Sequence, residues 1–166
     1  MTRINLEDQT YFVTGTTHRR RELFSDTELA RIVVDQWQHY QKPHDFDLQA
    51  YAVMPDHYHV LLQINGDHNL SRILYAVHSY SSKLINERLD GEDREKIWQG
   101  DAFDEVIRSE DMYYQKLAYI LFNPWRADLV ENPYCKYEFC NLGEWKEEEG
   151  EEFLEDLYSK YGRWAE

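Results

Sequence analysis

The sequence predicts an α+β fold in which an antiparallel sheet packs against helices, and three observations lead to this prediction. Short segments rich in β-branched and aromatic residues alternate with longer segments whose apolar residues recur at helical spacing. A Pro-Asp turn is all that separates one pair of strand segments, so these strands should form a hairpin. The chain has 166 residues, 42% of them hydrophobic and 15% aromatic, which suits one domain with one core.

The first half of the chain predicts a strand, a helix and a hairpin. Residues 10–18, TYFVTGTTH, have the composition of a strand. The helix that follows should begin at a capping box in residues 25–28, SDTE, and stop near Pro43. Residues 46–54 alternate as a half-buried strand does, and residues 57–64 run back as its hairpin partner.

The second half of the chain predicts helices around one more strand. Asn69 or Ser71 can cap the first helix and Ser109 the second, which should end close to Asn123-Pro124 because proline disfavours helix in the residue before it. The expected elements are a helix at 69–89, a polar link at 90–96, a short strand at 103–107 and a helix at 109–122. This order favours a ferredoxin-like antiparallel sheet with helices on one face.

The acidic residues are unevenly distributed. The formal net charge is −14, and residues 131–166 hold 11 of the 32 acids and 4 of the 18 bases, which is half of that charge. We therefore divide the chain into a domain at 1–142 and an acidic helical tail at 143–166. Acidity argues against nucleic acid, whose backbone repels a negative surface, but the basic cluster HRRR at 18–21 and a metal can still attract phosphate.

The sequence favours a cytoplasmic protein with no membrane segment. Its N-terminus, MTRINLEDQTYF, has no apolar signal core, and no stretch approaches the ~20 apolar residues of a membrane span. Cys135 and Cys140 are most simply free thiols in a reducing compartment.

Two histidines flank a tyrosine in the stretch VMPDHYHVLL, which begins at Val53. Side chains alternate along a strand, so His57 and His59 share one face and Tyr58 points to the other. Two imidazoles on one strand supply two of the three protein ligands of a typical catalytic metal site. Hydrogen-bonded structural histidines are the alternative, and so short a motif does not decide between them.

The segment LAYILFNP carries a second candidate pair. Tyr119 and Asn123 are four residues apart, a spacing that puts them on one face of a helix. If that face meets the histidine strand, Asn123 can give a carbonyl oxygen to the metal, with the Tyr119 hydroxyl beside it. A free tyrosine hydroxyl, with a pKa of about 10, is a poor nucleophile, but a metal that draws charge off phosphorus lets it attack. The alternative is a core aromatic and a helix-end residue.

These segments, taken in order, resemble the single-tyrosine HUH transposases, and among them the REP-associated tyrosine transposase group. VMPDHYHVLL is followed some sixty residues later by YILFNPWRADLV, and the segments THRRRELF, SYSSKLIN and WQGDAFDEVIR fit as well. The resemblance covers about Tyr11 to Phe139 and rests on the combination of motifs rather than on any one of them.

The resemblance implies a ferredoxin-like fold and an HUH-type endonuclease that cleaves single-stranded DNA and transfers strands at palindromic hairpin elements. It implies a divalent metal, Mg²⁺ or Mn²⁺, held by His57, His59 and Asn123. It assigns Tyr119 as the nucleophile that forms a 5′-phosphotyrosine and leaves a free 3′-hydroxyl. The partner would be a single-stranded DNA hairpin, bound by a monomer or a homodimer.

Basic residues are candidates for DNA contact, although each can instead form a surface ion pair. The candidates are Arg19, Arg20, Arg21, Arg108 and Arg126. Two other functions stay open. One is a domesticated protein that binds DNA hairpins without cutting them, and the other is an RNA- or protein-interaction domain with structural zinc held by the histidines together with Cys135 and Cys140.

Overall fold

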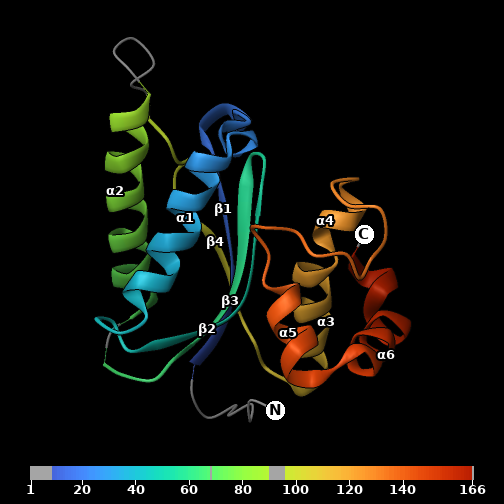
Figure 1. Ribbon diagram of the computed structural model, residues 1–166. Helices are drawn as coiled ribbons and strands as arrows, with labels where there is room; N and C mark the ends of the chain where they lie inside the picture. The colour runs from blue at the N-terminus through green and yellow to red at the C-terminus, as the bar shows by residue number, and fades with distance from the viewer. Residues whose placement is uncertain (1–8, 68, 90–95, 166) are drawn as a thin grey trace.

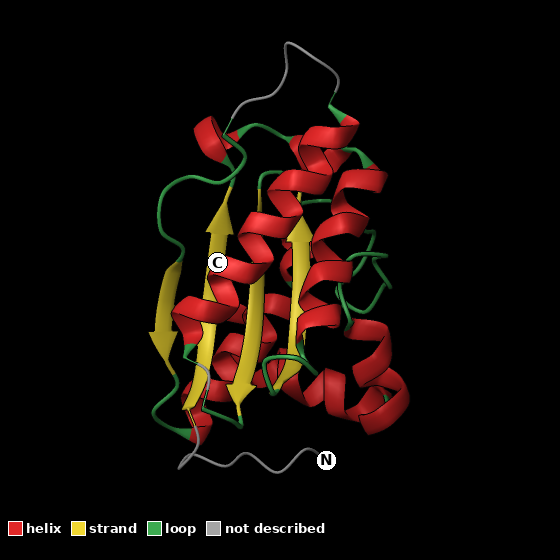
Figure 2. Ribbon diagram, turned by 90° about the vertical axis from the view of Figure 1, so that its left-hand side faces the viewer, coloured by secondary structure: helices red, strands yellow, loops and turns green. Residues whose placement is uncertain are grey.

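The computed structural model describes residues 9–67, 69–89 and 96–165, so residues 1–8 and most of the predicted polar link at 90–96 lie outside the described residues. Over the described ranges an antiparallel sheet of four strands has the order β2-β3-β1-β4, which Figure 2 shows face-on. The strands are β1 (Gln9–Thr16), β2 (Phe46–Met54), β3 (His57–Ile64) and β4 (Phe103–Val106).

Helices lie on both faces of this sheet, which gives the molecule three layers (Figure 1). One face carries α1 (Thr27–Tyr40) and α2 (Leu70–Arg88). The other carries α3 (Glu110–Leu121), with α5 (Leu142–Glu149) and α6 (Glu151–Tyr161) packed around it. The predicted α+β class and its antiparallel sheet are confirmed, but the helices are not confined to one face. The reason lies in β2 and β3, which are buried almost without interruption and therefore need cover on both sides.

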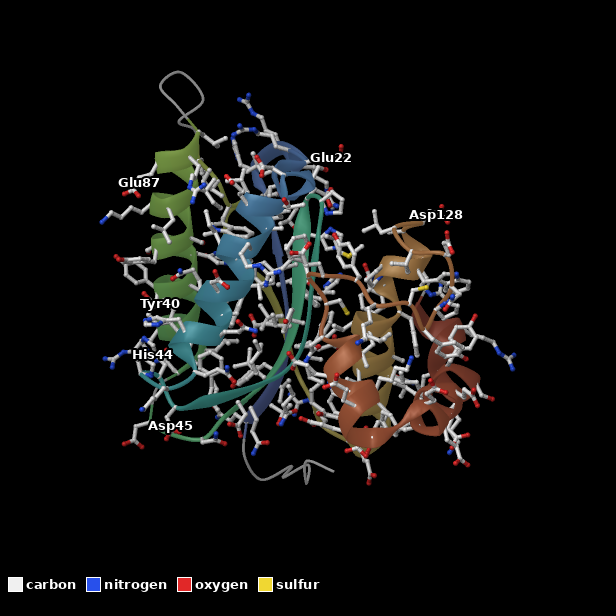
Figure 3. All side chains as sticks on the ribbon, in the orientation of Figure 1. Glu22, Tyr40, His44, Asp45, Glu87 and Asp128 are labelled. Carbon is white, nitrogen blue, oxygen red and sulfur yellow. The ribbon has the colours of Figure 1, made fainter. Side chains whose placement is uncertain are left out.

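A separate apolar cluster fills the space on each side of the sheet (Figure 3). Because side chains alternate along a strand, Tyr58 and Val60 of β3 join the cluster under α1 and α2, whereas Leu61 joins the cluster under α3. Gly15 of β1 makes room for the first of these, since a Cβ at this position would overlap the Tyr58 ring. The sheet therefore separates the apolar cluster under α1 and α2 from the face on which both histidines lie.

Polar side chains cap the helices close to the predicted positions. Asn69 accepts a hydrogen bond from the Arg72 N–H, and Ser109 accepts one from the Met112 N–H, which fixes the starts of α2 and α3. The predicted capping box at the start of α1 is replaced by a different cap, in which the Asp26 carboxylate accepts from the Glu28 N–H at 2.9 Å. The helix consequently begins one residue later than the box predicted.

The acidic C-terminal segment folds into α5 and α6, which are separated at Gly150, where φ is 91°. Burial of Trp145, Leu154 and Leu157 against the α3 face holds both helices. The chain just before them also closes the outer edge of β2, because the Val53 N–H donates to the Phe139 carbonyl at 2.8 Å. This edge is therefore not free to pair with a strand of another molecule.

Across the residues that the structure describes, every helix falls short of the length or the hydrophobicity that a bilayer span demands.

A buried histidine of α2 gives the folded state a pH dependence. His78 Nε2 lies 2.7 Å from the Tyr58 hydroxyl, and its ring stacks on Trp98 with centroids 4.5 Å apart. Burial lowers the pKa of His78 from 6.5 to about 4. The neutral imidazole is therefore favoured in the folded state, whereas the unfolded chain takes up a proton below pH 6.5.

We expect the stability that His78 contributes to be fully present above pH 6.5 and to be lost as the pH falls toward 4. The loss in unfolding free energy should be on the order of 3 kcal/mol, and urea unfolding between pH 4 and 7 measures it. A His78→Phe variant keeps the stack on Trp98 and removes the titration, so its stability should fall less over this interval. Parallel pH profiles of the two proteins would contradict the assignment.

Candidate active site

The two histidines are positioned by the hairpin turn that precedes β3. The Asp56 carbonyl in this turn accepts hydrogen bonds from the Thr17 N–H at 2.9 Å and from the Thr17 hydroxyl at 3.1 Å, which ties the turn to the end of β1. His57 and His59 follow on the face toward α3, with ring centroids 4.7 Å apart. Neighbouring imidazoles on a strand held in this way are fixed relative to each other before any ligand arrives.

Each imidazole uses Nδ1 for a hydrogen bond. His57 Nδ1 lies 2.6 Å from Asp56 Oδ1, and because a carboxylate only accepts, the ring donates. His59 Nδ1 lies 2.8 Å from Thr14 Oγ1. When Nδ1 carries the proton, the lone pair is on Nε2, and His59 Nε2 is buried with no hydrogen-bond partner among the described residues. A metal-ligating histidine has this arrangement, with the second ring nitrogen held by an oxygen.

The surroundings keep His59 neutral and Asp56 charged. Burial lowers the pKa of His59 well below 6.5, and the nearby His57 and Lys116 lower it further. Burial acts to raise the pKa of Asp56, but its hydrogen bond to His57 and the Arg20 guanidinium hold this pKa below its usual 3.8. A neutral imidazole is the form that binds a metal, and an ionised carboxylate is the better partner for the His57 ring.

Helix α3 brings the predicted nucleophile to this pair. The Tyr119 ring lies 4.9 Å from the His59 ring, centroid to centroid, and meets it edge-on. Both rings contact Phe12 of β1, which stacks on His59 at 5.4 Å and meets Tyr119 at 5.8 Å. The tyrosine helix and the histidine strand therefore face each other within one chain.

Asn123 is less closely associated with the histidines. It does not continue the face of α3, because α3 ends at Leu121 and Asn123 begins the short helix α4 (Asn123–Arg126). Its side chain is half-buried, and within the described residues it forms no hydrogen bond with either imidazole. Among the described residues, no hydrogen bond occupies the Asn123 side-chain amide, which lies four residues after Tyr119 in the sequence.

The candidate DNA-binding arginines are divided between different parts of the molecule. Arg20, in the 3-10 helix η1 (His18–Arg20), lies 3.4 Å from Asp56 and so next to His57. Arg19 is exposed beside it, and both residues have positive φ, 58° and 53°. Left-handed backbone at non-glycine residues is unusual and is often found at functional loops. Arg21 follows this turn and is half-buried.

Two other candidates are not brought to the histidines. Arg108 follows the end of β4 that pairs with Tyr11. Tyr11 is five residues along β1 from Thr16, which lies opposite His57, and five strand residues span about 17 Å. The Arg126 guanidinium donates to the Gly162 carbonyl and holds the C-terminal turn η4 (Gly162–Ala165) against α4.

Lys116 is a charged residue next to the site. Its sequence context does not distinguish it from an exposed lysine on a helix. Its ammonium lies 3.1 Å from Glu105 of β4 and 4.6 Å from the Phe12 ring centroid. Thr14 and Phe12, which contact His59, were also not predicted. The alternation in the first strand puts these two on one face, but only the pairing of β1 with β3 shows that this face is the one with the histidines.

A zinc site that joins the histidines to the cysteines does not form in the described part of the chain, where no three His, Cys, Asp or Glu side chains gather closely enough to hold a metal. Cys140 is buried, its sulfur lies 3.9 Å from the Ile120 and Leu121 carbonyls, and burial raises its pKa to about 12. The candidate metal donors are therefore the two imidazoles and an amide oxygen.

Two imidazoles of β3 and a tyrosine of α3 thus face each other on one side of the sheet. The sequence model described as "Transposase IS200 like" matches residues 5–110, and the chain belongs to this family. The match ends at the first turn of α3, so it covers both histidines but neither Tyr119 nor Asn123.

Known relatives agree with this class. The chain is 32% identical over 94 residues, 52% of its length, to a provisionally named REP-associated tyrosine transposase of Haemophilus influenzae, of which the match covers 53%. It thus spans about half the length of this curated relative. The predicted resemblance to the REP-associated group is confirmed.

Two solved structures share the fold. A REP-associated tyrosine transposase bound to a REP hairpin superimposes with a TM-score of 0.64 at 20% identity, over 87% of this chain and 82% of the other. A provisionally named transposase of Deinococcus radiodurans gives a TM-score of 0.54 at 18% identity, over 80% of this chain and 97% of the other.

Proposed function

We propose that this protein is a metal-dependent endonuclease and transposase for single-stranded DNA, which cuts and rejoins strands at palindromic hairpin elements through Tyr119. The observation that carries the proposal is the 4.9 Å approach of the Tyr119 ring to the ring of His59, whose Nε2 is buried without a partner in the described chain. Membership of the IS200-like transposase family and a relative bound to a REP hairpin support it.

The donor set fits a divalent ion. His57 and His59 would each supply an imidazole nitrogen, and the Asn123 amide oxygen would complete a three-ligand set that leaves positions open for substrate. Mg²⁺ or Mn²⁺ bound there would polarise a phosphate oxygen and align the scissile bond. Thr14 and Asp56 would keep both rings oriented, as their hydrogen bonds to Nδ1 do already.

Tyr119 would perform the covalent step. Its hydroxyl oxygen attacks phosphorus, the bond from phosphorus to the 3′-oxygen breaks, and that oxygen leaves as a 3′-hydroxyl with the proton given up by the tyrosine. The phosphate stays on the tyrosine as a 5′-phosphotyrosine. Because one phosphate ester replaces another, attack by a 3′-hydroxyl can reverse the step and join a new strand.

The arginines next to the histidines would bind the hairpin. Arg19, Arg20 and Arg21 lie on the turn that borders His57 and would contact phosphates near the cleavage point. Arg108 and Arg126, which lie elsewhere, would contact more distant parts of the DNA. In this proposal residues 1–142 form the nuclease and the acidic segment 143–166 limits nonspecific binding.

Incubation with a labelled DNA hairpin tests the function. We expect a covalent protein–DNA adduct on a denaturing gel in the presence of Mn²⁺ or Mg²⁺, and none in excess EDTA. The adduct should resist boiling in detergent and disappear on proteinase digestion. Hairpin binding without an adduct under any divalent metal would contradict cleavage and leave a hairpin-binding protein.

A further inference from the structure

The sheet carries an exposed aromatic ring in the same row as His59. Antiparallel pairing aligns His59 of β3 with Thr14 of β1, and Thr14 with Phe103 of β4. Residues paired across strands point to the same face, so Phe103 lies on the face of the histidines. Two strand spacings put its Cα about 10 Å from that of His59.

Phe103 is 59% exposed, in contrast to Phe12 on the adjacent strand, which is 4% exposed. Figure 2 shows β4 at the margin of the sheet, where no element of the described chain lies beyond it. A large apolar ring left in water beside a reaction centre has an unused stacking surface.

The charge around Phe103 is compatible with DNA on this face. Asp104 pairs with Val13 and therefore points to the opposite face, whereas Glu105 shares the face of Phe103. Lys116 neutralises Glu105 at 3.1 Å, and its ammonium stands over Phe12, between this edge and Tyr119. The surface on this face thus combines an exposed ring with an ion pair that has no net charge, although the chain as a whole is acidic.

We propose that Phe103 forms a stacking subsite for a nucleobase of the single-stranded DNA adjacent to the scissile phosphate, with Lys116 next to the backbone of that nucleotide. Base–aromatic stacking tolerates any sequence, so the subsite would position the strand rather than read it. The inference rests on the proposed function, because it takes single-stranded DNA as the occupant of the site.

A second copy of the chain is the competing occupant, through pairing along the free edge of β4. The charges oppose this arrangement. In an antiparallel pair of two FDEV segments, residues of the same face lie opposite each other, so Asp104 would meet the second Asp104 or Glu105 the second Glu105. Like charges directly opposite each other are destabilising.

Fluorescence of 2-aminopurine tests the subsite without any cleavage. The probe is a set of DNA hairpins with single-stranded flanks, each carrying 2-aminopurine at one flank position, bound to protein with the Tyr119→Phe substitution. We expect quenching at one position near the cleavage point, and its loss on Phe103→Ala with binding weakened roughly 5- to 150-fold. Phe103→Tyr should preserve both signals.

Tyr75→Ala is the matched control, since Tyr75 is 77% exposed but lies on α2, on the opposite face of the sheet. It should change neither binding nor quenching. Unchanged binding and quenching in Phe103→Ala would overturn the subsite alone. The same would follow if sedimentation showed a dimer of the wild-type protein and a monomer of Phe103→Ala, because the ring would then serve pairing between copies of the chain. Absence of any hairpin binding would overturn the subsite and the proposed function together, whereas binding with stacking but no adduct formation by the wild-type protein would overturn cleavage only.

Discussion

Replacement of Tyr119 by phenylalanine should abolish the covalent protein–DNA adduct and lower hairpin cleavage by on the order of 10⁴-fold or more. The substitution removes the attacking oxygen and nothing else. Its ring can keep the contacts with His59 and Phe12, at 4.9 and 5.8 Å in the wild-type protein. Folding and hairpin affinity should therefore stay near wild type, which circular dichroism and a binding titration would show.

Tyr114→Phe is the matched control for this experiment. Tyr114 lies on the same helix and is also half-buried, but its ring contacts Tyr113 and Tyr161 rather than the histidines. This variant should form the adduct at the wild-type rate. An adduct that persists in Tyr119→Phe, or that disappears in Tyr114→Phe, would show that the nucleophile is wrongly assigned.

The His59→Phe variant should separate catalysis from stability. A phenyl ring can keep the stack on Phe12, and it removes a buried Nε2 that has no partner within the described chain, a situation that costs about 1–3 kcal/mol. The hydrogen bond to Thr14 that is lost is worth about 1 kcal/mol. The metal-free variant should therefore unfold within about 1 kcal/mol of wild type or be more stable.

Cleavage by the same variant should fall by on the order of 10³-fold or more, because a metal contributes several kcal/mol to charge stabilisation and one of its ligands is gone. Urea unfolding, Mn²⁺ titration and the adduct assay together measure these effects. A Thr14→Val variant keeps the His59 imidazole but removes the hydroxyl oxygen that is hydrogen-bonded to its Nδ1. The metal affinity of this variant should therefore fall about 10- to 100-fold, which is less than the loss expected for His59→Phe. A His59→Phe protein that loses several kcal/mol of stability yet still cleaves would mean that this histidine is structural.

Local sequence patterns predicted most of the fold. The pattern of residues 46–54 and the Pro-Asp turn after them predicted the hairpin of β2 and β3, and the residues that cap α2 and α3 were predicted too. The prediction that β2 is half-buried was wrong, because helices cover both faces of the sheet. The predicted start of α1 was one residue too early. Ser25 and Asp26 are both good caps, and only the geometry of the preceding turn determines that Asp26 is the cap. The acidic tail appeared to be one surface helix, since its few buried residues become recognisable only once α3 is in place beside them.

The residues of the candidate site also divide into those that local sequence patterns predict and those that only the tertiary structure brings together. That His57 and His59 share a face follows from the two-residue period of a strand, and that Tyr119 lies on a helix follows from its apolar spacing. Both are properties of short segments and can be read from sequence. The sequence by itself also determined the class of fold and the resemblance to the single-tyrosine transposases.

Only the tertiary structure decided that Thr14 binds the Nδ1 of His59, that Lys116 lies over Phe12, and that Phe103 stands exposed in the row of His59. These arrangements bring together residues that are 44 or more positions apart in the chain. They depend on strand register and on the docking of α3, and a shift of one residue in register would turn every side chain of a strand to the other face. Packing of the whole core selects that register, so no local pattern contains it.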